Sequence, residues 1–466
     1  MVYLYNNKYL NNILISGLPG ILSIFLSFFS IPIFLNLLSA DLYANFLIQH
    51  SILTLGMVLN LNLGKFAAIK IQKVNLNNKK KIIFTSLITS FVTGILLSAI
   101  TYLVILFFFE NKNFFNISFS LFLGLFVTIF FISIEHIAKG LGYFRLYSIS
   151  NFLFYSVSLS LPAFFLIISS QNFNILNNLF IVSLYVKCFS LLCLIFYLIF
   201  KKDLILTKLD FKLFIEFKIH SRWMTLSAFY NQIYDYIDKY LIKITLGSVM
   251  LVTYAVPQLI AAKLTIFAHA IIAVLLPKLS IKRNNRQKKE ILSANLYLFL
   301  NLIGVILILL LPFYDELLKW WLKDSYNLEI LKIFKIFILL TFLGCFSLII
   351  IAFYEANLVS KKNTRYETVS IIPFCIGLLY CVYCGNIFLF AFLLMFKEFI
   401  MLFVRLINIK KYIINFKIFN STIILFFLAY IFSFFDYFYM ANTISIIFLI
   451  FLIKGHQTKL IKKEFF

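Results

Sequence analysis

One apolar stretch of the chain, residues 223–245, contains an unusual density of polar side chains. Asp235 and Lys239 lie four residues apart, so on a helix they share a face and can neutralise each other. Asp238 lies three residues after Asp235 on much the same side, and Asn231 and Gln232 lie one turn earlier. Two interpretations remain open: the group is a structural ion pair, or one of the carboxylates carries a coupling proton or cation.

Isolated lysines in two other apolar stretches could bind an anion. Lys187 and Lys263 lie well inside these stretches, and ammonium groups in an apolar cavity form strong charge-assisted hydrogen bonds with phosphate oxygens. Lys239 is a third candidate. The structural alternative is that each lysine pairs with a carboxylate or extends to the lipid headgroups, as we expect of Arg405.

The composition requires a membrane environment. Of 466 residues, 62% are hydrophobic and 13% are charged, and the mean hydropathy is +0.98. A soluble protein is roughly half apolar and about a quarter charged, so too few polar side chains remain to cover a soluble multidomain enzyme. Six cysteines in this length also exclude a disulfide scaffold.

The apolar stretches are long enough to cross a bilayer as helices, which takes about 20 residues each. The sequence therefore predicts an all-α polytopic membrane protein with 12–14 transmembrane helices. A charge at the bilayer centre costs about 2.5–3.5 kcal/mol, so the polar stripe of residues 223–245 must face a lobe interface or a wet cavity. The candidate spans are 13–37, 43–64, 83–109, 116–136, 147–169, 177–200, 223–245, 250–277, 291–313, 330–355, 367–384, 387–408, 418–435 and 440–454, the last two of which could form one bent segment.

The loop charges predict the orientation. Nearly all Lys and Arg residues outside the spans lie at the termini or in loops that follow even-numbered spans, whereas the opposite loops hold Lys112, Lys319 and Lys323. Cytoplasmic loops hold the positive excess, so we expect both termini in the cytoplasm of a multi-pass inner-membrane protein. The net charge of +24 is divided among short clusters between apolar runs, which favours a membrane surface over nucleic acid.

Other chemistry finds little support in the sequence. Cys381 and Cys384 have CxxC spacing but lie in an apolar span without ligand partners, so reduced packing cysteines are the better interpretation. The chain lacks a phosphate-binding GxxxxGK[ST] loop, and its longest outer loop lacks a catalytic constellation. We therefore expect no metal, no cofactor and no enzymatic activity.

An internal repeat suggests two similar halves. Residues 38–48 and 246–256 match loosely at the outer ends of spans 1 and 7, and spans 4 and 10 both end in a glutamate, Glu135 and Glu355. Six spans per copy give parallel repeats, an arrangement common in transporters. The predicted organisation is an N-terminal six-helix lobe (1–215), a C-terminal six-helix lobe (216–412), and an accessory helix pair with a basic tail (413–466).

Five segments, in the same order along the chain, resemble a known family of membrane exporters. They are residues 38–46, 61–71, 136–152, 229–247 and 275–280, with the sharpest likeness in FYNQIYDYIDKYLIKITLG. The chain thereby resembles the polysaccharide-transport branch of the multidrug/oligosaccharidyl-lipid/polysaccharide exporter superfamily, which includes Wzx-type O-antigen and capsule repeat-unit flippases. Serine and alanine replace the glycines of that family's first turn.

The resemblance implies two six-helix lobes around a V-shaped central cavity. It also implies a flippase that moves undecaprenyl-pyrophosphate-linked oligosaccharide repeat units across the bacterial cytoplasmic membrane by alternating access, for lipopolysaccharide O-antigen or capsule biosynthesis. In that case Lys187, Lys263 and Lys239 would hold the diphosphate while the lipid tail stays in the bilayer. Other polysaccharide-assembly proteins are possible partners.

Three alternatives stay open. A cation-coupled multidrug exporter of the same superfamily would be expected to have an acidic residue in span 1, and residues 13–37 contain none. A lipid II flippase is a close relative that the sequence does not exclude. A membrane sugar polymerase or glycosyltransferase is the least favoured, because such enzymes need a sizeable outer loop with catalytic residues.

Overall fold

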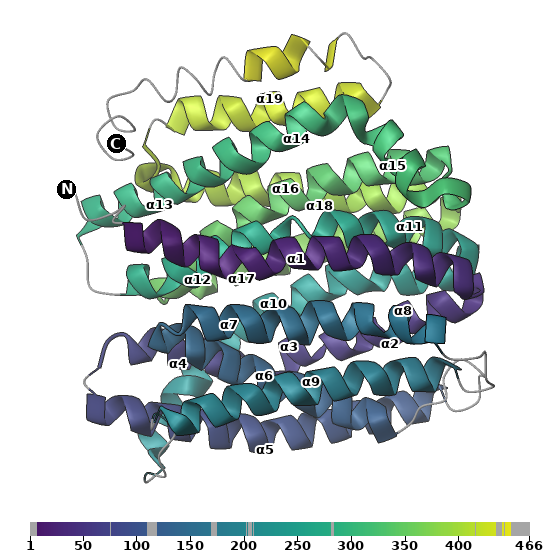
Figure 1. The fold of residues 1–466 in the computed structure, drawn as a ribbon. Helices are drawn as coiled ribbons and strands as arrows, with labels where there is room; N and C mark the ends of the chain where they lie inside the picture. Colours follow the sequence, from purple (N-terminus) through teal and green to yellow (C-terminus); the bar gives the residue numbers. More distant parts are fainter. Residues whose placement is uncertain are drawn as a thin grey trace. The chain divides into compact units, whose positions relative to one another are not determined.

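The structure is a computed structural model of the chain. It describes residues 7–74, 76–109, 119–168, 175–201, 203, 207, 209–280, 284–414, 416–434, 440–441 and 443–448. Every regular element within these ranges is a helix (Figure 1), which confirms the predicted all-α class. The apolar composition explains this outcome, because helices satisfy their own backbone hydrogen bonds in lipid.

Figure 1 shows the order of the helices along the chain. Their bounds are α1 (Asn7–Leu37), α2 (Ala40–Thr54), α3 (Gly56–Leu59), α4 (Leu63–Ile71), α5 (Leu76–Phe109), α6 (Phe119–Leu141), α7 (Phe144–Asn151), the π-helix η1 (Phe152–Val157), α8 (Ser158–Ile168), α9 (Ile175–Phe200), α10 (Phe211–Leu246), α11 (Ser248–Ala262), α12 (Thr265–Ser280), α13 (Asn285–Phe299), η2 (Leu300–Gly304), α14 (Val305–Leu310), η3 (Leu311–Phe313), α15 (Tyr314–Leu322), η4 (Lys323–Ser325), α16 (Leu328–Ala356), α17 (Ser360–Cys384), α18 (Ile387–Ile409), η5 (Lys410–Tyr412) and α19 (Phe416–Phe434).

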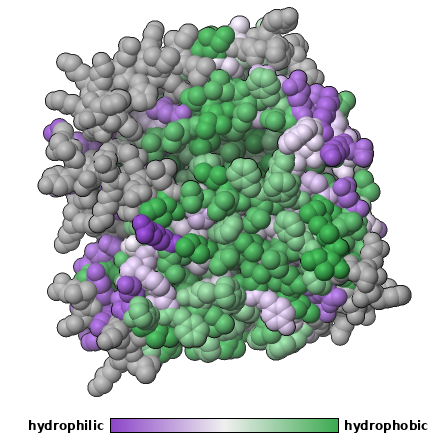
Figure 2. All heavy atoms as spheres, viewed as in Figure 1, coloured by the Kyte–Doolittle hydropathy of each residue, from purple (hydrophilic) through white to green (hydrophobic). Residues whose placement is uncertain are grey.

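Ten helical segments of the described ranges are long and apolar enough to cross a membrane. They correspond to predicted spans 1, 3–6 and 8–12, so the protein is a multi-pass membrane protein. Figure 2 shows mostly hydrophobic side chains on the face in view, with hydrophilic ones toward the ends of the helices. Predicted span 13 corresponds to the shorter apolar helix Phe419–Phe434, and much of predicted span 14 lies outside the described residues.

Predicted span 2 is a broken helix instead of a continuous one. Leu61 and Asn62 adopt left-handed φ angles of 54° and 52° between α3 and α4. In this break, the side-chain amide of Asn60 donates to the Ile129 carbonyl (2.6 Å) and to Ser133 Oγ (2.5 Å). These contacts hold the interrupted segment against α6 and thereby stabilise the break.

The chain forms two compact units. Unit 2 comprises Leu18–Val252 and Glu355–Ile371, and unit 1 comprises Met1–Gly17, Thr253–Tyr354 and Ile372–Phe466. In unit 2, α6 packs closely against α4, α5 and α9. In unit 1, α19 packs on α14 and α15, because Tyr430 donates to the Leu307 carbonyl (3.3 Å) and bonds with the Tyr314 hydroxyl (2.7 Å). The predicted lobe boundaries stay a prediction.

Candidate functional site

Lys187 lies in the middle of an apolar helix in unit 2. It is the thirteenth of the 26 residues of α9, and only 3% of its surface is exposed. Its Nζ lies 5.1 Å from the centroid of the Phe154 ring. A helix of this length spans the bilayer, so Lys187 is near the depth at which transporters bind their substrates.

The Phe154 ring next to the Lys187 ammonium is held in place by stacking on a second ring. Phe154 belongs to the π-helix η1, a wide turn of a kind often found at functional sites. Its ring stacks on that of Phe131 from α6, with centroids 3.7 Å apart and planes 9° apart. Lys187 forms no ion pair with any carboxylate that the structure describes, and its burial argues against an extension to the headgroups. Neither structural alternative is therefore observed for this lysine.

The polar stripe predicted on residues 223–245 lies within the single long helix α10. Asp238 is fully buried, and its Oδ1 accepts a hydrogen bond from the backbone N–H of Lys239 (2.7 Å). The Nζ of Lys239 lies 4.6 Å from the centroid of the Tyr236 ring. The side chain of Asp235 is outside the described residues, so its predicted pairing with Lys239 stays a prediction.

The side chains at the start of the stripe, Asn231 and Gln232, are more exposed than Asp238. Asn231 and Gln232 are both half-buried. The Oε1 atom of Gln232 is enclosed without a hydrogen-bond partner among the described residues. A buried amide oxygen in this state is a ready acceptor or cation ligand.

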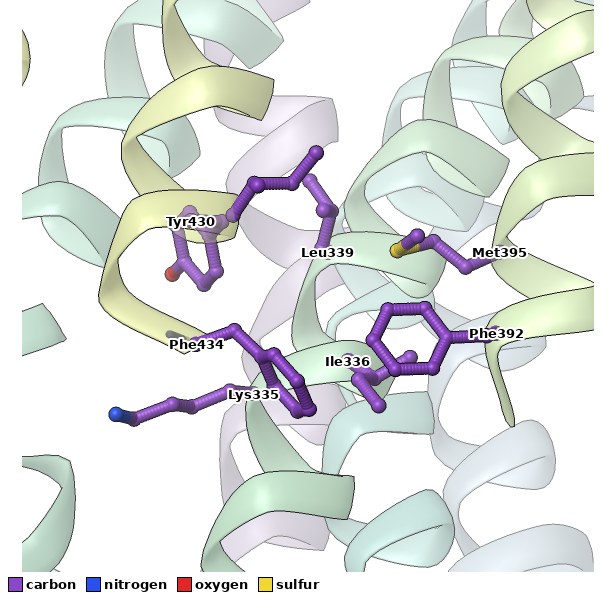
Figure 3. A pocket seen from close by; sticks show the side chains of 8 residues that line it. Lys335, Ile336, Leu339, Phe392, Met395, Tyr430 and Phe434 are labelled. Carbon is purple, nitrogen blue, oxygen red and sulfur yellow. The ribbon is translucent and has the colours of Figure 1, made fainter. Parts of the chain in front are cut away.

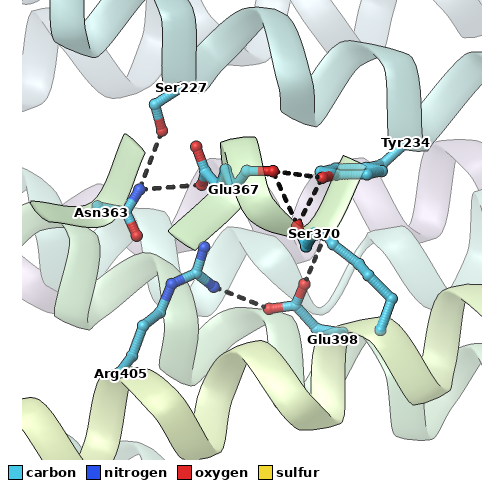
Figure 4. Close-up of polar contacts among 8 residues, drawn as sticks. Ser227, Tyr234, Asn363, Glu367, Ser370, Glu398 and Arg405 are labelled. Atoms are coloured by element: carbon cyan, nitrogen blue, oxygen red, sulfur yellow. Dashed lines mark hydrogen bonds and ion pairs between the residues drawn. The ribbon is translucent and has the colours of Figure 1, made fainter. Parts of the chain in front are cut away.

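A second polar network, which the sequence interpretation missed, joins α10 to the first half of α17 (Figure 4). The Asn363 side-chain amide donates to Ser227 Oγ (3.0 Å) and to Glu367 Oε1 (2.9 Å). The Tyr234 hydroxyl bonds with Ser370 Oγ (2.7 Å) and donates to the Glu367 backbone carbonyl (3.1 Å). Glu367 is fully buried, as is Asp238 on α10.

The neighbouring charges explain why this network was missed. Lys361, Lys362 and Arg365 make the start of α17 look like a basic loop in the sequence. The available signal was the spacing of Asn363 and Glu367, which are four residues apart and therefore share one helix face.

Two glutamates that marked the internal repeat both bind lysines in unit 2. Glu135 Oε1 lies 2.7 Å from Lys139 Nζ and accepts a hydrogen bond from Asn151 Nδ2 (3.2 Å). Glu355 Oε1 lies 2.6 Å from Lys65 Nζ. Each of these glutamates is therefore neutralised by a neighbouring lysine.

Lys263 belongs to unit 1, where it lies in the turn between α11 and α12. It is half-buried, and its backbone N–H donates to the Ile260 carbonyl (3.0 Å). The turn follows Pro257, which interrupts the hydrogen bonding of α11. Lys263 therefore lies at a helix interruption inside a candidate span. Its predicted role in binding an anion stays a prediction.

Unit 1 also contains a buried charge cluster on α18. Arg405 is 1% exposed, and its guanidinium donates to Glu398 Oε1 (3.3 Å). Lys397 Nζ lies 3.1 Å from Glu398 Oε2. The expectation that Arg405 reaches the lipid headgroups is therefore wrong. A carboxylate seven residues earlier holds the guanidinium inside the protein.

A small cavity of about 60 Å³ lies between α16, α18 and α19 of unit 1 (Figure 3). It is lined mainly by apolar side chains, among them Leu339, Phe392 and Met395. At its edge, Lys335 Nζ donates to the Ser433 carbonyl in the last turn of α19 (2.9 Å). A cation at a helix C-terminus complements the helix dipole, so Lys335 stabilises the packing of α19.

The described ranges contain no cluster of three or more His, Cys, Asp or Glu side chains that could hold a metal ion. Cys381 is buried and Cys384 is exposed, and both are free thiols. The candidate functional residues are a buried lysine on α9 and buried carboxylates on α10 and α17.

Comparison with known proteins relates the sequence to one curated transporter. No family model matches the sequence. Over 159 residues, the chain is 26% identical to a Shigella flexneri protein described as "Putative O-antigen transporter". This match covers 34% of the chain and 38% of that relative, so the chain spans little more than a third of the relative's length in the match.

Solved structures share the fold over most of the chain. An outward-facing multidrug resistance MATE family transporter of the MOP superfamily matches with a TM-score of 0.68 at 13% identity, covering 86% of this chain and 96% of that one. A MOP superfamily transporter from Pyrococcus furiosus matches with a TM-score of 0.67 at 12% identity, covering 87% and 96%. A Vibrio cholerae MATE transporter matches with a TM-score of 0.64 at 11% identity, covering 88% and 98%. These likenesses confirm the predicted fold.

Proposed function

Because the chain has the fold of the multidrug and polysaccharide exporter superfamily, and part of it resembles an O-antigen transporter, we propose that it is a lipid-linked oligosaccharide flippase. Its substrate would be an undecaprenyl-pyrophosphate-linked repeat unit, moved across the bacterial cytoplasmic membrane. Transport by alternating access would expose the substrate site to each side in turn. The product would enter O-antigen, capsule or a related surface glycan.

The observation that carries this proposal is the buried side chain of Lys187 at the middle of α9. Intramembrane ionisable residues that lack a structural partner mark substrate or ion pathways. The diphosphate is the charged part of the glycolipid, and an ammonium group would hold it by charge-assisted hydrogen bonds. Lys239 and Lys263 are proposed as further cations for the same anionic substrate.

We propose that the buried carboxylates couple transport to an ion. Asp238 is the first candidate because it is fully buried on α10, with Asp235 as the second. Asn231 and Gln232 would supply neutral oxygen ligands or hydrogen bonds along the same helix. Glu367 joins this set, since its carboxylate is also fully buried and accepts a hydrogen bond from an amide.

The second candidate function is a cation-coupled multidrug exporter, which the structural relatives of the MATE family favour. A lipid II flippase shares the diphosphate chemistry and differs in the sugar. A buried lysine without a carboxylate partner among the described residues would oppose binding of cationic drugs and attract anions, so Lys187 favours the glycolipid. A sugar polymerase or glycosyltransferase stays the least favoured function.

The proposed placement follows the charge distribution of the loops. Both termini would be cytoplasmic, and other polysaccharide-assembly proteins would meet the flippase at this membrane. Fusion of a reporter that is active only in the cytoplasm to either terminus would test this orientation.

The function can be tested in a bacterial strain whose own repeat-unit flippase has been deleted. The wild-type chain should restore the surface glycan, and Lys187→Ala should lose most of this activity. Lys332→Ala is the matched control, because Lys332 is exposed on α16 and should leave export normal. Restored glycan with Lys187→Ala, at equal membrane abundance, would remove the proposed role of this cation. Drug resistance without any surface glycan would favour the exporter alternative.

A further inference from the structure

The buried face of α9 presents a hydroxyl group one turn before Lys187. Ser183 lies four residues before Lys187, so the two side chains project from the same side of the helix. Ser183 is 2% exposed and Lys187 is 3% exposed. The two polar groups are therefore enclosed together by the protein, near the middle of a candidate membrane span.

The two serines of α9 that flank Lys187 differ in their hydrogen bonding. The Ser190 hydroxyl donates to the Lys187 backbone carbonyl (2.8 Å), which is the usual way for a helix to satisfy a buried serine. The Ser183 hydroxyl has no hydrogen-bond partner among the described residues. The Ser183 hydroxyl is therefore available to donate to a ligand. Such a bond would remove the free-energy cost of leaving a buried hydroxyl without a partner.

We propose that the Ser183 hydroxyl and the Lys187 ammonium together hold one phosphate group of the substrate diphosphate. This inference rests on the proposed function and adds a second ligand to its site. Side chains four residues apart on a helix have Cβ atoms about 5–6 Å apart, so both can reach oxygens of one phosphate. A neutral donor beside the cation adds a hydrogen bond to an ionised acceptor, which is stronger than one between neutral groups.

The surroundings of the pair favour an anion as the ligand. The Phe154 ring covers one side of the ammonium, and Phe131 supports that ring from behind. The nearest carboxylate on the supporting helix α6, Glu135, is already bound to Lys139 and Asn151.

The test measures binding of undecaprenyl diphosphate to the purified full-length protein in lipid nanodiscs. Ser183→Ala should weaken binding about tenfold, as expected for one hydrogen bond to a charged group. Ser183→Thr keeps the hydroxyl and should bind within about threefold of the wild type. Ser190→Ala is the matched control and should bind normally, because the Ser190 hydroxyl is already used within the helix. Thermal unfolding of each variant verifies that it is folded.

The outcomes separate this inference from the proposed function. If Lys187→Ala weakens binding while Ser183→Ala and Ser190→Ala both bind normally, the role of Ser183 is refuted and the function stands. If Lys187→Ala also binds normally, the lysine site itself is refuted. Inorganic diphosphate should compete in the wild type, and phosphatidylglycerol should not. Equal competition by phosphatidylglycerol would instead assign the pair to a phospholipid headgroup and overturn the inference.

Discussion

Replacing Gly64 with alanine should destabilise unit 2 by separating α4 from α6. A Cβ atom at Gly64 would lie 2.6 Å from the Cα and carbonyl oxygen of Ser133. These are backbone atoms, so no side chain can rotate away, and the helices must move apart. Overpacking of this kind costs about 1–3 kcal/mol, and the better helix propensity of alanine offsets up to about 1 kcal/mol of it.

The assay is thermal unfolding of the purified protein in detergent, followed by intrinsic fluorescence. Gly64→Ala should lower the midpoint by several degrees. Gly344→Ala is the control, because a Cβ there would have no atom within 4 Å among the described residues, and its midpoint should stay unchanged or rise. Equal midpoints for Gly64→Ala and wild type would refute the inferred close approach of α4 and α6.

Three further changes test the polar groups inside the two units. Tyr234→Phe removes the hydroxyl that bonds Ser370 and should cost about 0.5–1.5 kcal/mol of stability, measured by thermal unfolding. Asp238→Asn should leave the fold intact but remove the dependence of glycan export on the ion gradient, and unchanged coupling would assign Asp238 a structural role. Glu398→Ala leaves Arg405 buried without this carboxylate and should cost about 3–5 kcal/mol, the range for breaking a buried ion pair; a wild-type melting curve would contradict this expectation.

The sequence predicted the fold well because a bilayer restricts the possible structures. Long apolar runs in lipid must be helices, and ten of the predicted spans are helices of sufficient length. The break at Leu61 and Asn62 could not be predicted, because it depends on Asn60 contacts with α6, 69 and 73 residues away in the sequence. Apolar periodicity carries no information about such distant polar partners.

The candidate site was predicted only in part, since residue type shows where a charge lies but not what it contacts. The sequence placed Lys187 well inside an apolar stretch and predicted that Arg405 extends to the lipid headgroups. The structure gives Arg405 a carboxylate partner and gives Lys187 an aromatic ring instead. Glu367 was overlooked because its neighbours are basic, yet α17 buries it completely.

Two buried lysines of unit 2 have different surroundings. Lys139 has a carboxylate partner, whereas Lys187 lies next to an aromatic ring. Lys139 is neutralised by Glu135 at 2.7 Å, so its removal would leave the buried carboxylate without this cation. Lys187 has no such partner within the described ranges, and a methionine would fill nearly the same volume. Burying a charge without a partner costs free energy, and an apolar side chain of similar volume avoids this cost. Lys187→Met should therefore raise the melting midpoint while abolishing glycan export. A variant that is less stable than the wild type would mean that Lys187 contributes to folding, and the argument for an anion-binding role would lose its physical basis.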